Sequence, residues 1–170
     1  MNEIEIKLKV DSFDGLREKL SMAGFEMKKK DIETAIFFDD DSGSLSEKGV
    51  TVRIKKGSGW SSFAVKQKRQ DEDYKIADEH QVDISDAEEM TDALKLLGLQ
   101  KKFEYKKERE HWENNDLVVE LDNISDIGVY FVEVEAGSGE AIEGVIMMLG
   151  LQGAEREKRS YPDIVKEAVK

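Results

Sequence analysis

The sequence predicts an α+β domain in which eight antiparallel strands form a barrel and amphipathic helices pack on its outside. Eight short segments alternate apolar with charged residues, which is the period of a strand with two different faces. Gly, Asp, Asn or Ser separates these segments, and four stretches with helical apolar spacing interrupt them. Eight strands are enough to close into a barrel whose interior holds one small ligand.

The length of the chain supports a single domain over residues 1–170. Apolar residues make up 39% and charged residues 38%, and no linker or low-complexity tract divides the sequence. We therefore expect one folded unit with its own core.

Charge and composition exclude several classes of protein. The net charge of −12 disfavours nucleic acid and anionic membranes as partners, so any polyanion must meet a local cluster of cations. Acidic residues near the start do not fit a signal peptide, and no stretch approaches the roughly 18 apolar residues of a membrane span. The absence of cysteine removes thiolate chemistry and suits a reducing compartment. These features predict a cytoplasmic protein without membrane contact.

The strands are predicted from alternation bounded by turn residues. In chain order the expected strands are 2–10, 34–39, 50–56, 61–69, 75–84, 103–113, 116–122 and 129–136.

Two helices are predicted between these strands from capping signals. The first follows Ser12 as N-cap and ends at Gly24. The second begins at Ser85, with Glu88 three residues later as in a capping box, and ends at Gly98. The residues expected to be buried are Phe13, Leu16, Leu20 and Ala23 in the first helix and Met90, Leu94 and Leu97 in the second.

Two further helices are predicted after the last strand. One ends at Gly150, and the other begins at Ser160 with Pro162 in its first turn, where a missing N–H costs nothing. The residues expected to be buried in the longer of the two are Ile142, Val145, Ile146 and Leu149.

The charged strand faces segregate by sign. Residues two apart share a face of a strand, and the same-sign pairs are Glu3 with Glu5, Glu133 with Glu135, Arg53 with Lys55, Lys66 with Lys68, and Lys107 with Arg109. An open sheet with one solvated face is the alternative, and each strand taken alone fits it. Such a sheet gains nothing from same-sign neighbours, however, so the segregation favours a charged interior.

A charged interior predicts a particular ligand. Cations that face inward would repel one another and lose hydration, and a multiply charged anion would neutralise them. Two carboxylates at positions i and i+2 lie about 6.6 Å apart along a strand. That spacing suits an oxygen-ligated divalent ion that bridges to the anion, and Mg²⁺ or Mn²⁺ fits phosphates best.

An ordered set of short motifs resembles the CYTH superfamily, the triphosphate tunnel metalloenzymes, which includes class IV adenylyl cyclases and thiamine triphosphatases. The N-terminal Glu-x-Glu-x-Lys signature stands at Glu3, Glu5 and Lys7. The motifs that follow are Phe37-Phe38-Asp39, Arg53-x-Lys55, Lys66 in Phe-Ala-Val-Lys, Lys107-x-Arg109, Glu120-x-Asp122, Glu133-x-Glu135 and Ser160-Tyr161. This order spans nearly the whole chain, and it implies an eight-stranded antiparallel tunnel.

The resemblance also implies roles for single residues. The triphosphate would be bound by Lys7, Arg53, Lys55, Lys66, Lys107 and Arg109. The metal ions, Mg²⁺ or Mn²⁺, would be held by Glu3, Glu5, Asp122, Glu133 and Glu135. The residues expected to take part in catalysis are Glu5, Lys7 and Glu79.

The fifth strand departs from the family pattern Arg-x-Glu-x-Glu. Glu79 keeps the first acid, Gln81 replaces the second, and the arginine is missing unless Lys75 substitutes for it. This departure bears on the hydrolytic end of the site.

The resemblance implies an enzyme that acts on a small-molecule triphosphate, namely tripolyphosphate, ATP or thiamine triphosphate, as a monomer or homodimer. Hydrolysis is the expected reaction, because a small tunnel domain needs no nucleoside pocket for it. Two alternatives stay open: a class IV adenylyl cyclase that makes cyclic AMP and pyrophosphate, and a sensor that only binds a polyphosphate or nucleotide. The paired acids argue against the sensor, since cations alone would serve for binding.

Four other residues and one loop have expected places. His80 is expected to face outward and His111 to serve a structural role near the mouth of the barrel. Trp60 and Trp112 are expected to be packing or rim residues, and residues 39–41 are expected to start a solvated loop.

Overall fold

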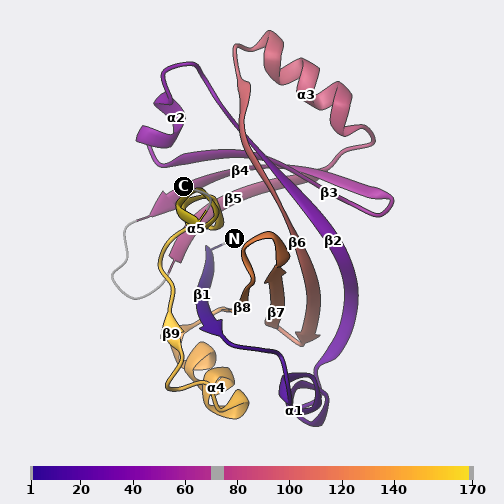
Figure 1. Cartoon of the computed structure of the whole chain (residues 1–170), viewed down its shortest axis with the longest axis vertical. Coiled ribbons are helices and arrows are strands. Elements are labelled where there is room, and N and C mark those ends of the chain that lie inside the picture. Colours follow the sequence, from indigo (N-terminus) through magenta and orange to yellow (C-terminus); the bar gives the residue numbers. More distant parts are fainter. Residues whose placement is uncertain (1, 70–74, 169–170) are drawn as a thin grey trace.

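Most of the chain lies in the strands of a long, curved sheet (Figure 1). The computed structural model describes residues 2–69 and 75–168. For Asn2, Glu3, Arg69 and residues 75–77 it describes only the backbone. The strands are β1 (Asn2–Val10), β2 (Glu26–Asp39), β3 (Val50–Gly57), β4 (Trp60–Arg69), β5 (Lys75–Asp83), β6 (Gln100–Asn114), β7 (Leu117–Ile124), β8 (Val129–Ala136) and β9 (Glu155–Arg156). The helices are α1 (Leu16–Met22), α2 (Ser44–Glu47), α3 (Ala87–Leu96), α4 (Gly139–Leu149) and α5 (Tyr161–Ala168), with a 3-10 turn η1 (Ser125–Ile127).

The strand order is β5-β4-β3-β2-β6-β7-β8-β1-β9. The described pairings are antiparallel, which together with the helices confirms the α+β class. All eight predicted strands are present, and the two-residue β9 makes a ninth. The strand β5 also pairs with β1, from Asn2 opposite Asp78 to Glu5 opposite Lys75.

The start of β2 was predicted eight residues too late, because its first half does not alternate. Residues 26–31 read Glu-Met-Lys-Lys-Lys-Asp, which has no apolar face of period two. Pairing with β6 makes this segment a strand, from Glu26 opposite Glu113 to Asp39 opposite Gln100. A neighbouring strand has overridden the local pattern.

Two predicted helix caps are wrong by a few residues. The N-cap of α1 is Gly15, whose backbone has φ 74°, and Ser12 instead accepts a hydrogen bond in the turn before it. The N-cap of α3 is Asp86 and not Ser85, since the Asp86 carboxylate accepts from the backbone N–H of Glu88 at 2.8 Å. A carboxylate at the N-cap satisfies exposed N–H groups as well as a hydroxyl does.

The short helix α2 was not predicted, and the solvated loop expected from residues 39–41 begins only after Asp39, with Asp41 exposed. Asp39 is 4% exposed, and its carboxylate accepts from the backbone N–H of Leu45 and Ser46. Asp40 likewise accepts from the backbone N–H of Ser44. These acids therefore fix the start of α2.

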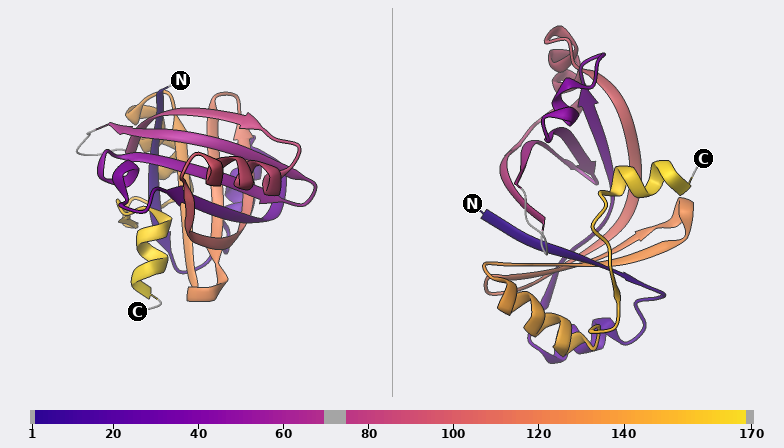
Figure 2. Two further views of the ribbon diagram at one scale, coloured as in Figure 1. Left: turned by 90° about the horizontal axis from the view of Figure 1, so that it is seen from above. Right: turned by 90° about the vertical axis from the view of Figure 1, so that its left-hand side faces the viewer.

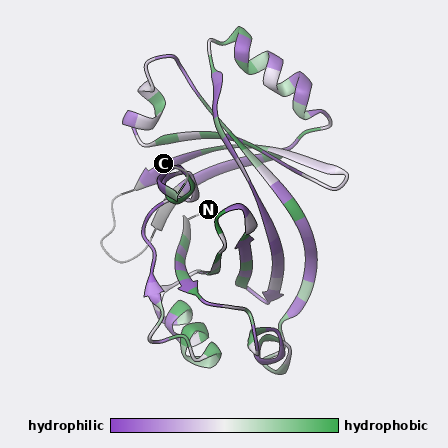
Figure 3. Ribbon diagram, in the orientation of Figure 1, coloured by the Kyte–Doolittle hydropathy of each residue, from purple (hydrophilic) through white to green (hydrophobic). Residues whose placement is uncertain are grey.

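Two apolar clusters cover one face of the sheet. At one end α1 and α4 pack on β1, β7 and β8, and Figure 3 shows hydrophobic residues gathered on these two helices. At the other end α2 and α3 pack on β2 and β3. Figure 2 gives two further views of these helices and of the curved sheet. The predicted burial of Leu94 is confirmed, whereas Leu97, the C-cap of α3, is 76% exposed. The apolar residues predicted for α4 are all buried.

The helix α5 packs against the opposite, polar side of the sheet. Its residues Tyr161, Ile164 and Val165 form a cluster with Tyr105 and Phe131. In residues 2–69 and 75–168, none of the helices has the length and hydropathy required to span a membrane.

Candidate active site

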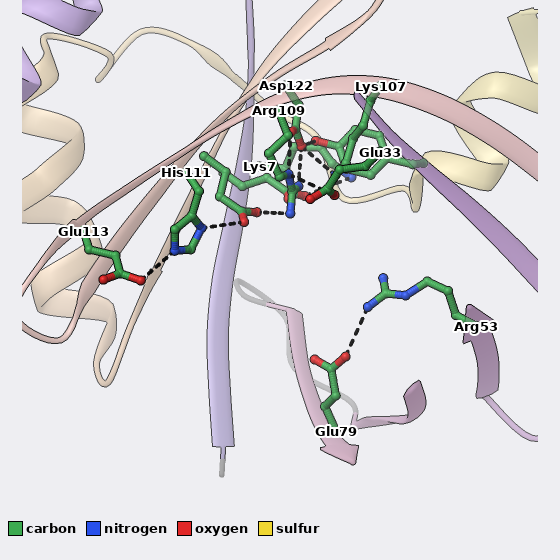
Figure 4. A network of polar contacts seen from close by, with 12 residues as sticks. Lys7, Glu33, Arg53, Glu79, Lys107, Arg109, His111, Glu113 and Asp122 are labelled. Atoms are coloured by element: carbon green, nitrogen blue, oxygen red, sulfur yellow. Dashed lines mark hydrogen bonds and ion pairs between the residues drawn. The ribbon is translucent and has the colours of Figure 1, made fainter. Parts of the chain in front are cut away.

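One face of the sheet gathers charged residues from eight strands, and we call it the polar face. Its charged or hydroxyl side chains include Lys7 (β1), Glu33 (β2), Arg53 and Lys55 (β3), Ser62 and Lys66 (β4), Glu79 (β5), Lys107 and Arg109 (β6), Glu120 and Asp122 (β7), and Glu133 (β8). Figure 4 shows a dense cluster around Arg109 and Asp122, with the Arg53–Glu79 pair set apart from it.

Arg109 lies at the centre of three carboxylates. Its guanidinium pairs with Glu120, donates from Nε to Asp122 at 2.7 Å, and donates from Nη2 to Glu133 at 2.7 Å. Burial opposes the charged form, but the three carboxylates outweigh it and raise the pKa of Arg109 further. The strands β6, β7 and β8 are neighbours. Their register places Arg109 opposite Asp122 and Glu120 opposite Glu133, so these four side chains meet here.

Asp122 is fully buried and receives several donors. Lys107 donates to Oδ2 at 2.9 Å, and the hydroxyl of Tyr161 donates to the same oxygen at 2.5 Å. Burial and the charges of Asp122 and Glu133 raise the pKa of Tyr161, so that its hydroxyl remains a donor. Asp122 thus joins the sheet to α5.

A second group of ion pairs joins β3, β4 and β5. Glu79 pairs with Arg53 at 3.1 Å and with Lys66 at 2.6 Å. The structure therefore places Glu79 between two residues that the sequence assigned to triphosphate binding. Gln81 is exposed, and the side chain of Lys75 lies outside the described residues.

The expectation that the inward cations crowd one another does not hold for these pairs. The polar-face carboxylates of β5, β7 and β8 lie beside the cations of β4, β6 and β1, namely Lys66, Lys107, Arg109 and Lys7. Cations therefore meet carboxylates across the sheet, as Lys66 meets Glu79 and Lys107 meets Asp122.

Lys55 differs from the other cations of the polar face. Within the described chain it has no carboxylate at ion-pair distance, and its side chain is partly buried. Burial, together with the positive charges of Arg53 and Arg109, lowers the pKa of Lys55 to about 8. This amine thus remains available for an anion.

The side chain of Lys7 faces the C-terminal segment. It is 1% exposed, its amine donates to the backbone carbonyl of Arg159 at 2.7 Å, and it lies 4.1 Å from the centre of the Tyr161 ring. Glu133 stands 4.0 Å from the same amine.

The remaining predicted metal ligands lie further along β1 and β8. Glu5 and Glu135 are directly opposite each other in the register and both are partly buried. The side chain of Glu3 lies outside the described residues. The structure therefore brings Asp122 and Glu133 together and keeps Glu5 and Glu135 as a neighbouring pair.

Three polar residues near this centre had no predicted role in the chemistry. Glu120 shares a face with Asp122 by simple alternation, and His111 bridges Glu120 at 3.1 Å and Glu113 at 2.8 Å. The hydrogen bond that the protonated His111 ring donates to the Glu120 carboxylate is the main cause that raises the pKa of His111. Glu33 belongs to the part of β2 that was not predicted. Alternation would have identified Glu120, but no sequence signal identified Glu33.

The carboxylates of Glu120, Asp122 and Glu133 form a candidate metal site. One oxygen of each lies within 4.8 Å of the others. Three hard oxygen donors fit Mg²⁺ or Mn²⁺. The Arg109 guanidinium now supplies the positive charge at this point, so a metal ion would have to take over its contacts.

Sequence comparisons relate this chain to known proteins. The model of the CYTH domain matches residues 1–161. A proposed adenylate cyclase of Methanocaldococcus jannaschii is 30% identical over 135 residues, which cover 79% of this chain and 77% of that protein.

Two solved structures share the fold at low identity. A proposed adenylate cyclase from Vibrio parahaemolyticus has a TM-score of 0.81 and 19% identity, covering 96% of this chain and 97% of its own. A proposed adenylyl cyclase from Hippeastrum, described as having a dominant triphosphatase activity, has a TM-score of 0.73 and 20% identity, covering 97% and 95%.

Proposed function

This chain belongs to the CYTH family, and we propose that, as a CYTH-type enzyme, it binds a metal-complexed triphosphate against the polar face and hydrolyses it. Tripolyphosphate and an organic triphosphate such as ATP or thiamine triphosphate are the substrates considered.

The proposal includes a tunnel formed by β1–β8. The pairing of β5 with β1 supports it, because these strands stand far apart in the remaining strand order. In this arrangement the polar face lines the inside, while the apolar clusters under α1, α3 and α4 lie outside. Eight strands leave room for side chains and one small ligand.

The observation that carries the proposal is the balance of charge on the polar face. Arg109 is held by three carboxylates, and Glu79 is shared by Arg53 and Lys66. A triphosphate alone would take the cations and leave buried carboxylates without partners, which is costly. A divalent cation that arrives with it restores those partners, so we expect both to bind together.

The polar face offers separate groups for the two parts of this ligand. Arg53, Lys55, Lys66, Lys107 and Arg109 are the proposed phosphate ligands, and Lys7 adds positive charge behind them. The proposed metal ligands are Glu3, Glu5, Glu120, Asp122, Glu133 and Glu135. A bound Mg²⁺ or Mn²⁺ would supply Lewis-acid stabilisation of charge on the phosphate oxygens.

In hydrolysis, a water oxygen attacks the terminal phosphorus, and the bond to the bridging oxygen breaks. Glu5 and Glu79 are the carboxylates proposed to orient this water and accept its proton. Basic residues aimed at the phosphates stabilise the charge that develops on the leaving diphosphate. Lys7 contributes to that charge stabilisation from its buried position.

Adenylyl cyclase activity is a second candidate, favoured by the relative from Methanocaldococcus jannaschii. In that reaction the ribose 3′-oxygen attacks the α-phosphorus, and pyrophosphate leaves. The same cations and acids would serve it, so the products must distinguish the two reactions.

We expect turnover of tripolyphosphate to orthophosphate and diphosphate, with Mg²⁺ or Mn²⁺ required. The measurement is product analysis with tripolyphosphate, thiamine triphosphate and ATP, each with Mg²⁺, Mn²⁺ or a chelator. If ATP yields cyclic AMP and pyrophosphate without orthophosphate, the protein catalyses the cyclase reaction and not hydrolysis. If all three ligands bind and no product forms, the protein is a sensor that only binds a polyphosphate or nucleotide.

A further inference from the structure

The indole ring of Trp60 is held in a fixed orientation by β2. Its Nε1 donates to Oδ2 of Asp31 at 2.7 Å, and the backbone N–H of Ser58 donates to the same oxygen at 2.9 Å. Burial opposes the charged form of Asp31, but these hydrogen bonds outweigh it and lower the pKa, so the carboxylate stays an acceptor. An aromatic ring that is fixed before a ligand arrives loses little entropy when it binds one.

Gly57 leaves the space that this ring fills. It lies directly opposite Trp60 in the register of β3 and β4, and it is two residues from Lys55, so both positions belong to the polar face. A Cβ added at Gly57 would collide with Nε1 and Cε2 of the Trp60 ring. The ring therefore covers β3 on the polar face and reaches Asp31 on β2.

A cation lies over the face of the Trp60 ring. The amine of Lys29 stands 3.4 Å from the ring centre, and Asp31 stands 3.9 Å from that amine. The side chain of Lys29 is 41% exposed. Cation–π contacts at exposed positions are weak, so a ligand can displace the amine at little cost. The contact marks this face of the indole as accessible and attractive to positive or electron-poor groups.

The ring lies near residues that are proposed to bind phosphate. Gly57 is two residues from Lys55 on β3, and Arg53 stands two residues further along the same strand. Two strand rises span about 6.6 Å. A phosphate at Lys55 and a flat ring on Trp60 can therefore belong to one molecule, with a short linker such as a sugar between them.

We propose that Trp60 binds the organic group of the substrate, and that the protein thereby selects a triphosphate with a flat heteroaromatic ring over tripolyphosphate. In this complex the ring of the ligand takes the place of the Lys29 amine against the indole. The phosphate ligands alone give no such preference, since tripolyphosphate offers them the same groups. The inference rests on the proposed function, because that function places the phosphates on the polar face.

Calorimetric titration of the full chain with Mg²⁺ and two probes tests this selection. The probes are ATP and tripolyphosphate in which methylene groups replace both bridging oxygens, so that neither hydrolysis nor cyclisation can occur. The wild type should bind the ATP analogue at least about tenfold more tightly, which corresponds to the stacking of one base on an aromatic side chain.

Replacement of Trp60 should affect the two probes differently. Trp60→Leu should weaken binding of the ATP analogue about tenfold and change that of the tripolyphosphate analogue less than about twofold. Trp60→Phe keeps an aromatic face without the N–H, so the affinity for the ATP analogue should stay within about threefold of the wild type. A merely structural role of Trp60 would lower both affinities alike.

Lys29→Gln removes the amine that competes for the ring. The ratio of the affinity for the ATP analogue to that for the tripolyphosphate analogue should rise about threefold, because no cation–π contact has to be broken. Lys28→Gln is the matched control, since Lys28 is exposed, pairs with Glu26, and makes the same change in charge. It should leave this ratio unchanged.

Indole fluorescence gives a direct signature of stacking. Trp112 is the second of the two tryptophans, and it is buried in the core under α1 and α4. In Trp112→Phe the indole emission comes from Trp60. The ATP analogue should quench this emission, and the tripolyphosphate analogue should not.

Two results would overturn the inference: equal affinity of the wild type for the two analogues, or an equal loss of both affinities in Trp60→Leu. If Trp60→Leu does not fold, an affinity ratio in Lys29→Gln equal to that in Lys28→Gln overturns it. Failure of the proposed function looks different. In that case the analogues would bind with the pattern above, but no triphosphate would be turned over.

Discussion

Replacement of Asp122 by asparagine is expected to lower the free energy of unfolding by about 3–5 kcal/mol, as removal of one partner from a buried ion pair does. Asp122 is fully buried and accepts from Lys107, Arg109 and Tyr161. Asparagine has nearly the same shape, but it carries no charge, and its amide nitrogen is a donor that faces other donors. The buried amine of Lys107 would then lose its nearest carboxylate.

Urea unfolding of the metal-free protein measures this loss of free energy. The slope of the free energy of unfolding against urea concentration should be unchanged if unfolding remains two-state. Asp116→Asn is the control, since Asp116 is exposed in the turn between β6 and β7. Its effect should stay within about 0.5 kcal/mol. A loss below about 1 kcal/mol in Asp122→Asn would contradict the contacts of the buried cluster.

Replacement of Glu120 by glutamine is expected to lower kcat about 100-fold or more. Loss of a carboxylate from the candidate metal site weakens transition-state stabilisation by several kcal/mol, and each 1.36 kcal/mol is tenfold in rate. The variant also removes one of the three carboxylates around Arg109. Glu133→Gln should behave similarly, because Glu133 belongs to the same cluster.

The measurement combines initial rates with the dependence of melting temperature on Mn²⁺ concentration. Glu104→Gln is the control, since Glu104 lies on β6 with an exposed side chain that pairs with Lys101. Glu120→Gln should shift the Mn²⁺ dependence to higher concentration, whereas Glu104→Gln should not. Wild-type rates and an unchanged Mn²⁺ dependence in Glu120→Gln would show that this acid cluster holds no metal.

Much of the fold follows from alternation alone. The segment 129–136 carries apolar residues on one face and Glu133 and Glu135 on the other, and it is a strand with the predicted bounds. The apolar spacing of α4 predicted its buried residues. The first half of β2 escaped prediction because only pairing with β6 makes it a strand.

The site was predictable residue by residue but not pair by pair. Parity and the resemblance placed Lys66, Arg109, Asp122 and Glu133 on one face. The strand order decides which charges meet, and this order does not follow the sequence order. For this reason the contact of Lys66 with Glu79 was not foreseen.

The contacts of α5 show the same limit. The sequence indicates Ser160 and Tyr161 only as a motif, whereas the structure shows that Tyr161 donates to Asp122, which lies 39 residues earlier in the chain. Lys7 was expected to face a ligand, and its amine donates to the carbonyl of Arg159. Contacts between residues 39 and 152 positions apart depend on the complete fold.

We expect metal and triphosphate to bind to the polar face together, because its charges are already balanced. Calorimetric titration with a methylene-bridged triphosphate analogue, which cannot be hydrolysed, tests it most directly. The affinity for the analogue should be at least about tenfold higher with Mg²⁺ than with a chelator, within the 5–150-fold usual for coupled ligands. Glu133→Gln should abolish the difference. Equal affinity with and without Mg²⁺, or a difference that survives in Glu133→Gln, would contradict it.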